Sequence, residues 1–340
     1  DFVKTMPMEA SPTVFGLHEN ANITYQMNTT NYMINTVLSL QSASGGGGGK
    51  SPDEQADEIA ADIESRMPTP LSIDEAHETT FAKMPDGSVN ALANCLMQEM
   101  EKFNKMLKFL KSSQFELRRS IKGLVVMSTE LEAMFGSFIN GQVPGNWSAN
   151  SYISRMPLGS WVADMILRVQ YFRDWLTTGS TKGLWVSAFF FPQGALTSAL
   201  QIYSRKTKTA IDSLAWRTEV MPFMVEDINN QQPPPNGVYI YGLFLEGAAW
   251  DKRNMCITES AKSVLFTKFP VIWLDPVNRL DKIPANSFRH PMYKVSTRAG
   301  TLSTTGHSTN FVMFLNIPAG PLGPAHWIKR GVAFLCLLDT

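Results

Sequence analysis

A proline-rich segment at residues 231–237, Gln-Gln-Pro-Pro-Pro-Asn-Gly, divides this chain into two parts with different sequence patterns. Consecutive prolines lack backbone N–H groups and fix the dihedral φ, so no helix continues through them. Apolar residues recur at helical spacing before this segment, and short runs rich in Val, Ile and Phe follow it. The sequence therefore predicts an α+β fold, with a helical part over residues 1–235 and a strand-rich part over residues 236–340.

The helical part contains several helix-start signals. Residues 51–54, Ser-Pro-Asp-Glu, form a capping box with proline in the first turn, and residues 113–116, Ser-Gln-Phe-Glu, form a second one. Ser160 and Pro192 are placed to begin two further amphipathic helices. Together with the apolar periodicity, these signals predict about six or more helices in this part.

The part that follows the prolines contains short apolar runs separated by Gly, Pro and Asn. Such spacing predicts about six strands in an antiparallel sheet or barrel. The predicted strands are residues 238–245, 264–266, 271–274, 292–297, 311–317 and 331–338.

Composition narrows the class of protein. The formal net charge is +0, which gives no overall field that would attract nucleic acid or an anionic membrane. Charged residues make up 18% of the sequence and hydrophobic residues 44%, which fits either a large core or a large partner interface. With no signal-peptide pattern, no run long enough to cross a bilayer and three scattered cysteines, we expect an intracellular segment of a longer protein.

Residues 44–51, Ser-Gly-Gly-Gly-Gly-Gly-Lys-Ser, are similar to a phosphate-binding P-loop. That motif needs a small first residue after a buried strand, whereas the residues before Ser44 have a helical pattern. Pro52 also removes an N–H group from the turn that would face a phosphate. We therefore predict a glycine-rich tether at residues 44–50 with Ser51 as a helix cap, and a nucleotide-binding enzyme is the alternative.

Two other groups of residues are candidates for chemistry. His307 and Ser308 are adjacent, but neighbours on a strand point to opposite faces, so a hairpin turn is the favoured interpretation. The remaining candidates lack the close ligand spacing of a zinc site or the pairing needed for acid–base work. The zinc candidates are His290, His307, His326, Cys256 and Cys336, and the acids are Glu246, Asp251 and Glu259. We expect no catalytic residue, metal or cofactor in this segment.

Four sequence blocks carry a resemblance to a known family. They are residues 153–161 (Ile-Ser-Arg-Met-Pro-Leu-Gly-Ser-Trp), 185–197 (Trp-Val-Ser-Ala-Phe-Phe-Phe-Pro-Gln-Gly-Ala-Leu-Thr), 304–311 (Thr-Thr-Gly-His-Ser-Thr-Asn-Phe) and 326–333 (His-Trp-Ile-Lys-Arg-Gly-Val-Ala). These aromatic-rich blocks resemble, in the same order, the C-terminal domain of dynein heavy chains, with the axonemal branch fitting best. The resemblance runs from about residue 14 to the last residue.

The resemblance implies a fold and a role. In that family a helical half is followed by a small antiparallel β-barrel, and the domain lies across one face of a ring of six AAA+ modules. The parent heavy chain is a minus-end-directed, ATP-driven motor of cilia and flagella that uses ATP and magnesium. It works with microtubules and with dynein intermediate and light chains. This segment is then expected to brace or regulate the ring without a reaction of its own, and a free-standing β-barrel binding module is a further alternative.

The aromatic residues of the second helical block are the candidates for the ring contact. They exceed what a modest helical core requires, so we expect some of them to lie at an interface and the isolated segment to self-associate. The strand-rich part is expected to be separable near Pro233, where the proline segment isolates it. The candidate contact residues are Trp161, Phe172, Trp175, Trp185, Phe189, Phe190 and Phe191.

Overall fold

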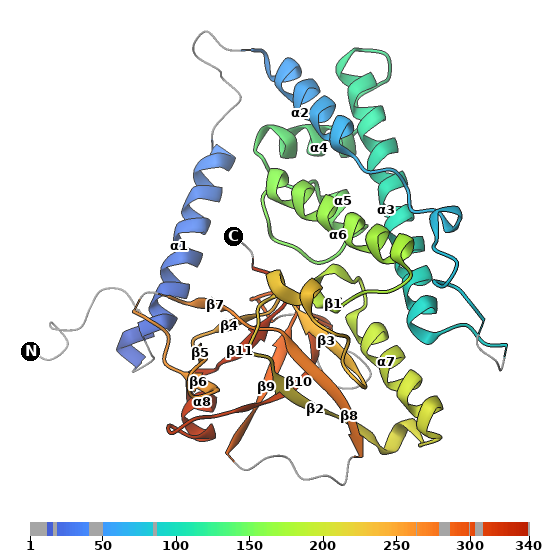
Figure 1. The fold of residues 1–340 in the computed structure, drawn as a ribbon. Helices are drawn as coiled ribbons and strands as arrows, with labels where there is room; N and C mark the ends of the chain where they lie inside the picture. The colour runs from blue at the N-terminus through green and yellow to red at the C-terminus, as the bar shows by residue number, and fades with distance from the viewer. Residues whose placement is uncertain are drawn as a thin grey trace, which may run out of the picture.

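The computed structural model describes residues 12–15, 19–40, 50–83, 87–262, 264–278, 286–298, 300–302 and 309–338. Figure 1 shows helices α2 to α6 grouped on one side of the molecule and the strands on the other, with α7 alongside both. The α-helices are α1 (Glu19–Leu40), α2 (Pro52–Arg66), α3 (Ala91–Ile121), α4 (Thr129–Ile139), α5 (Gly145–Ala149), α6 (Leu158–Thr178), α7 (Pro192–Thr207) and α8 (Pro324–Arg330).

Two of the predicted helix starts are confirmed. Helix α2 begins with the capping box: the Ser51 hydroxyl accepts from the Glu54 N–H at 3.2 Å, and the Glu54 carboxylate accepts from the Ser51 N–H at 2.9 Å. Helix α7 begins at Pro192, which suits a first helical position because its missing N–H has no partner there.

Two other predicted helix starts are wrong. Helix α3 continues through residues 113–116, because the Ser113 hydroxyl bonds the Leu110 carbonyl at 3.1 Å and accepts from the Trp147 indole at 2.9 Å. That hydroxyl is therefore used inside the core instead of capping a new helix. Helix α6 begins at Leu158 with Pro157 as its N-cap, three residues before Ser160, and the Leu158 side chain is buried.

The helices pack around aromatic side chains at the centre of the helical part. Trp147 lies edge-on to Phe138, with ring centroids 5.4 Å apart, and 5.8 Å from Trp161. Phe103 of α3 lies 5.2 Å from Phe172 of α6. All five rings are buried, and the core they belong to continues without interruption into the strands. Helices and strands therefore share one core.

The strands form two main sheets and a hairpin. The four-stranded sheet has the order β1-β3-β8-β2, the five-stranded sheet has the order β10-β9-β11-β4-β7, and β5 pairs with β6. The pairings are mostly antiparallel, but β1 is parallel to β3 and β11 is parallel to β9. The strands are β1 (Leu184–Trp185), β2 (Leu214–Val220), β3 (Val238–Tyr241), β4 (Phe244–Glu246), β5 (Ala249–Asp251), β6 (Cys256–Thr258), β7 (Phe266–Lys268), β8 (Ile272–Asn278), β9 (Ser287–Tyr293), β10 (Phe311–Pro318) and β11 (Ala333–Leu335).

The predicted run at 238–245 is divided between the two sheets. Gly242 has φ +79°, and a Cβ at this position would lie 2.5 Å from the Trp185 indole. Only glycine fits such a close approach at positive φ. The backbone therefore leaves the four-stranded sheet after Tyr241 and enters the five-stranded sheet at Phe244, with Leu243 buried between them.

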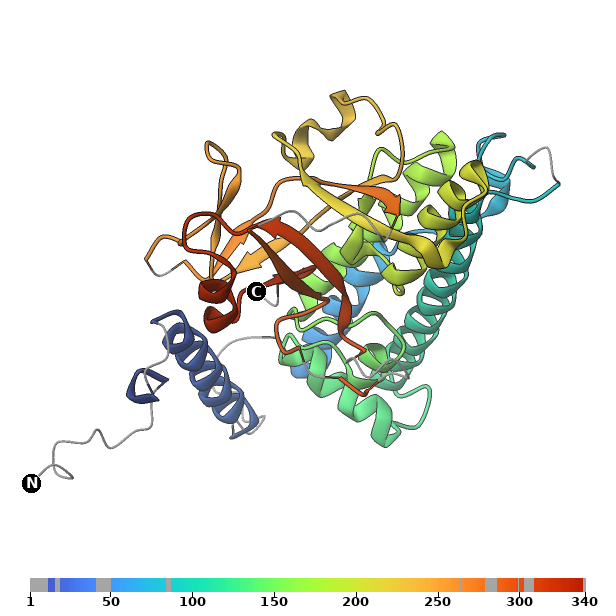
Figure 2. The same ribbon diagram turned by 90° about the horizontal axis from the view of Figure 1, so that it is seen from below.

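The division at residue 236 does not separate two independent bodies. Strand β2, from the part predicted to be helical, pairs with β8 along its full length, from Leu214 opposite Asn278 to Val220 opposite Ile272. The end of the proline segment also binds β8, because the Trp273 indole donates to the Asn236 carbonyl at 2.8 Å. Figure 2 shows the same continuity from below, with the strands beside the helices, and α7 contacts both α3 and β10.

The α+β class is confirmed, and the pairings of the described strands do not establish a closed barrel. In the described residues the five-stranded sheet ends at β10 on one side and β7 on the other. Strand β11 pairs with β9 in parallel, so this sheet is mixed, whereas the sequence predicted an antiparallel one.

Candidate functional site at the junction of the helices and the sheets

The segment between β1 and α7 is the point where helices and sheets meet. Phe189 is buried against α6, with its ring edge-on to Phe172 at 5.2 Å. Phe190 points the other way, edge-on to Phe103 of α3 at 4.9 Å and 6.0 Å from Tyr152. Adjacent aromatic residues therefore fix this segment between two helices and the loop before α6.

Two charged side chains hold the backbone of Phe190 from opposite sides. The Glu99 carboxylate of α3 accepts from the N–H groups of Phe190 at 2.8 Å and Phe191 at 3.1 Å. The Lys294 ammonium, just after β9, donates to the Phe190 carbonyl at 3.2 Å. Burial raises the pKa of Glu99, and burial also lowers the pKa of Lys294. Phe190 is thus tied to a helix and to a sheet at once.

A buried arginine makes a second set of contacts across the junction. Arg168 of α6 donates to the Asp164 carboxylate at 2.6 Å and to the Ser187 carbonyl. Its guanidinium lies 3.8 Å from the centre of the Tyr152 ring and 5.7 Å from that of Trp185. Stacking between aromatic faces suits the planar arginine group, and the carboxylate compensates its charge. Burial raises the pKa of Tyr152, so this phenol stays neutral.

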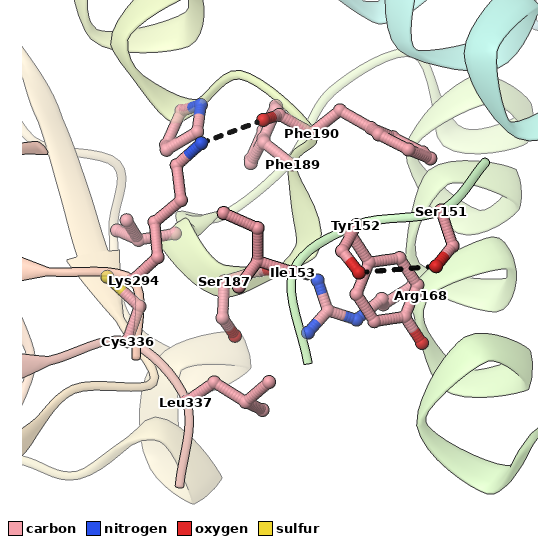
Figure 3. A pocket seen from close by; sticks show the side chains of 12 residues that line it. Ser151, Tyr152, Ile153, Arg168, Ser187, Phe189, Phe190, Lys294, Cys336 and Leu337 are labelled. Atoms are coloured by element: carbon pink, nitrogen blue, oxygen red, sulfur yellow. Dashed lines mark hydrogen bonds between the residues drawn. The ribbon is translucent and has the colours of Figure 1, made fainter. Parts of the chain in front are cut away.

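A small cavity of about 100 Å³ lies among these residues. In Figure 3, Lys294 and Cys336 enter from the sheet, Tyr152 and Arg168 from the helical side, and Ser187, Phe189 and Phe190 lie between them. Pockets that hold a drug-sized ligand are roughly 300–1,000 Å³, so this cavity is too small for a nucleotide. Burial raises the pKa of the Cys336 thiol to about 12, which leaves it protonated and a poor nucleophile at neutral pH.

The structure separates the predicted contact residues into three groups by exposure. Four of them are buried in the domain's own core, so in this conformation they are not accessible to a protein partner: Trp161, Phe172, Trp175 and Phe189. Trp185 and Phe190 are half-buried at the junction. Phe191 is the exposed member, with 51% of its surface accessible, and Lys102 of α3 lies 5.8 Å from the centre of its ring.

Sequence reasoning missed the charged residues of the junction, although the sequence carries a signal for two of them. Glu99 lies three positions after Leu96 and four before Phe103, on the apolar face of its helix. Arg168 lies four positions before Phe172 on the apolar face of α6 and four after its partner, Asp164. A charge on an apolar helix face indicates a buried, paired group. Lys294 carries no such pattern.

The residues considered for phosphate binding have structural roles where they are described. Ser51 is the cap of α2, and Lys50 pairs with Glu58 at 2.5 Å, with both side chains exposed. Residues 44–49 lie outside the described residues, so the structure does not test the tether. His307 and Ser308 also lie outside the described residues.

The histidines and cysteines considered for zinc, and the acids considered for acid–base work, do not gather into one site where the structure describes them. His326 of α8 contacts Glu259 at 2.7 Å, where Arg330 also binds, and Glu246 pairs with Arg298. Asp251 accepts from the N–H groups of the turn that follows it. His290 is fully buried, and burial lowers its pKa to about 3. In the part of the sequence that the structure describes, no three such side chains come together around a possible metal.

The arrangement is that of a structural junction between the helices and the sheets. Its charged groups bind backbone and aromatic groups of the neighbouring elements.

Among the described helices, none is both long and apolar enough to span a bilayer.

Comparison with known proteins identifies the family. The profile of the C-terminal domain of the dynein heavy chain matches residues 27–336. The sequence is 42% identical over 340 residues to dynein axonemal heavy chain 3 of Homo sapiens, an alignment that covers 100% of this chain and 8% of that relative. It is 40% identical over 338 residues to dynein axonemal heavy chain 1 of Mus musculus, covering 99% of this chain and 8% of that relative.

A third relative shows the same relationship in length. Identity to dynein axonemal heavy chain 6 of Homo sapiens is 39% over 358 residues, covering 100% of this chain and 9% of that relative. The segment thus spans less than a tenth of the length of these three relatives. With a family profile over most of its length and relatives of about 40% identity, this chain belongs to the dynein heavy chain family and is its C-terminal domain.

Proposed function

We propose that this chain is the non-catalytic C-terminal region of an axonemal dynein heavy chain and that it packs on the AAA+ ring of that heavy chain. The whole protein would be a minus-end-directed motor on microtubules in the axoneme of cilia and flagella. ATP and magnesium would be bound by the ring, and intermediate and light chains would attach elsewhere on the motor. The observation that carries this proposal is the identity to axonemal heavy chains along the full length of the sequence.

The junction supports a bracing role. A domain that resists the movement of a ring must itself be stiff, and close-packed cores transmit strain with little compression. Here the helical part and the sheets share one core, and Glu99, Lys294 and Arg168 tie them together. We infer that the domain moves as one body with the ring module to which it is attached.

The edges of the two main sheets support the family's barrel-like arrangement for the strands. The Asn316 N–H of β10 is 3.4 Å from the Thr218 hydroxyl of β2, so the edges of the two sheets adjoin at this point. We propose that the sheets act together as a barrel-like unit behind the helices.

Phe191 is the residue through which we propose that the junction reaches the ring. Its ring is half-exposed while its backbone is fixed by Glu99, so an aromatic anchor is presented on a rigid support. The half-buried faces of Trp185 and Phe190 belong to the same segment.

Replacement of Phe191 by Ser in the intact heavy chain tests this proposal. We expect ATP hydrolysis to continue, with altered microtubule gliding velocity or force, because the ring loses one contact with its brace. Ile328→Ser in α8 is the matched control, since that residue is also exposed, at 63%. Equal motility of both variants and the wild type, with the domain shown by cryo-EM to lie away from the ring, would refute the proposal.

A further inference from the structure

One face of α3 carries an unusual excess of positive charge. Between residues 101 and 122 the sequence has seven basic and two acidic residues, although the whole chain is neutral. Arg118 points inward and pairs with Asp57 and Glu64 of α2. The remaining six side chains are exposed, and we call them the basic face of α3: Lys102, Lys105, Lys108, Lys111, Arg119 and Lys122.

Acids near the basic face are few: Glu101 and Glu116 lie on the same helix and are exposed, and neither forms a close ion pair with it. The acids of α2 are used elsewhere, with Asp62 bound to Arg66 and Glu58 to Lys50. Among the described residues, no ion pair joins a member of the basic face to an acid. The contacts of two members are with aromatic rings, Lys102 with Phe191 and Arg119 with Phe115.

The spacing of these cations works against the helix. Lys102, Lys105, Lys108 and Lys111 follow one another at intervals of three, and like charges at this spacing are neighbours that destabilise an isolated helix. A helix face that meets only water usually alternates charges of both signs. An acidic partner would turn this repulsion into attraction.

Apolar residues are exposed at both ends of the basic face. Phe191 lies beside Lys102 at one end. At the other end the turn after α3 exposes Leu124 and Val126, the latter at 87%. The distance along the helix between the two ends is about 30 Å, at 1.5 Å per residue. Figure 1 shows α3 on the outer side of the helical part, so a long partner can lie along it.

We propose that the basic face of α3 docks against an acidic surface of the remainder of the same heavy chain. This inference rests on the proposed function, because it names the surface by which the domain would hold the rest of the motor. Exposed ion pairs are individually weak. A covalently attached partner is present at high effective concentration, so weak pairs suffice, whereas a free partner would need a stronger contact.

Other partners fit these observations less well. A membrane touched by Leu124 and Val126 would leave Lys102 about 30 Å away, beyond the Debye length of about 8 Å at physiological salt. Nucleic acid is disfavoured by the exposed apolar residues at both ends and by the absence of net charge on the sequence.

Zero-length carbodiimide cross-linking of the intact heavy chain, followed by peptide mass spectrometry, tests the proposal. The reagent joins lysine amines to carboxylates that touch them. We expect Lys105, Lys108 and Lys111 to be joined to acids outside residues 1–340, with yields that fall at high salt. The same lysines should acetylate several-fold more slowly than the exposed Lys182, Lys252 and Lys262, which serve as matched controls.

The triple variant K105E/K108E/K111E extends the test, with K182E/K252E/K262E as the control of equal charge change. K105E/K108E/K111E should abolish the cross-links from the basic face, and the control variant should keep them. Acetylation of the basic face at the control rate, with no external cross-link, would overturn the proposal. Binding of the wild type to phosphatidylserine vesicles or to a single-stranded RNA would also overturn it, if K105E/K108E/K111E loses that binding and the control variant keeps it.

The outcome also separates this inference from the proposed function. Cross-links to AAA+ modules from other lysines of the domain, with none from the basic face, would leave the ring contact intact and refute only the surface named here. If no lysine of the domain is joined to any residue outside 1–340, both the inference and the proposed ring contact fail.

Discussion

Glu99 accepts a 2.8 Å hydrogen bond from the backbone N–H of Phe190, which is 91 positions later in the sequence. The same carboxylate accepts from Phe191 at the N-terminus of α7, where a negative charge also suits the helix dipole. One side chain of α3 thereby fixes the segment that joins α6, α7 and the first sheet. This contact therefore adds to the shared core in joining the helices to the sheets.

Replacement of Glu99 by Ala should destabilise the domain by about 1–3 kcal/mol, because it leaves two partly buried N–H groups without their acceptor. Glu99→Gln keeps one acceptor oxygen and should cost less. Chemical denaturation of the heavy chain, with the exposed Glu101→Gln as control, measures the difference. A Glu99→Ala variant as stable as the Glu101→Gln control would show that the contact contributes nothing.

Glu99 should also give the stability a defined pH dependence. Burial raises the pKa of this carboxyl in the folded state, so the folded protein holds the proton more tightly than the unfolded one. Its contribution to the free energy of unfolding is therefore largest at low pH and falls as the pH rises through the folded pKa. The difference in free energy of unfolding between wild type and Glu99→Gln should decrease as the pH is raised. An increase with pH would contradict a raised pKa for Glu99.

Replacement of Arg168 by Met should be among the most damaging single changes. Removal of one partner of a buried ion pair costs about 3–5 kcal/mol, because the buried Asp164 side chain is left without its partner. The double variant D164L/R168M should recover part of this loss, since neither charge is then left alone. Thermal unfolding measures both, with the exposed Arg155→Met as control. Equal stability of the Arg168→Met and Arg155→Met variants would refute the structural role.

The role of Ser51 can be separated from that of a magnesium ligand. Ser51→Ala should destabilise α2 by about 1 kcal/mol through loss of the cap, whereas Ser51→Asp should retain the cap. Neither variant should change the ATPase of the intact motor, and Lys50→Ala should behave like them. A large fall in ATPase for Ser51→Asp, which would repel phosphate, would mean that residues 44–51 bind nucleotide.

Truncation near Pro233 should unfold more than the strands it removes. The deletion takes away β3 and β8, which pair with β1 and β2, and it opens the shared core. We expect the shortened domain to lose cooperative unfolding and become protease-sensitive. A truncated motor whose residues 50–230 stay as protease-resistant as in the full-length protein would support the separable part that the proline segment suggests.

Local signals located two of the four predicted helix starts. The capping box at Ser51, proline at position 192 and apolar periodicity act within a few residues, so sequence alone locates α2 and α7. The failures involve distant partners: Ser113 follows a capping pattern, but Trp147 uses its hydroxyl. Strand β2 lies among helices in sequence and becomes a strand because β8 pairs with it.

The contact residues show the same limit. Aromatic content identified the junction, but whether a ring faces the core or solvent depends on elements far away in sequence. Trp161 and Phe172 are covered by α3 and by the segment before α6, and Phe191 is exposed because the backbone turns into α7 there. Spacing predicts the face of a helix, and only the fold determines what covers that face.

A cryo-EM map of the intact heavy chain tests the central claim most directly, that this domain is a single body braced on the AAA+ ring. We expect the helices and sheets to keep the arrangement described above and to lie against one face of the AAA+ ring, with Phe191 covered at the contact. A domain held away from the ring, with Phe191 in solvent or with the sheets separated from the helices, would contradict it.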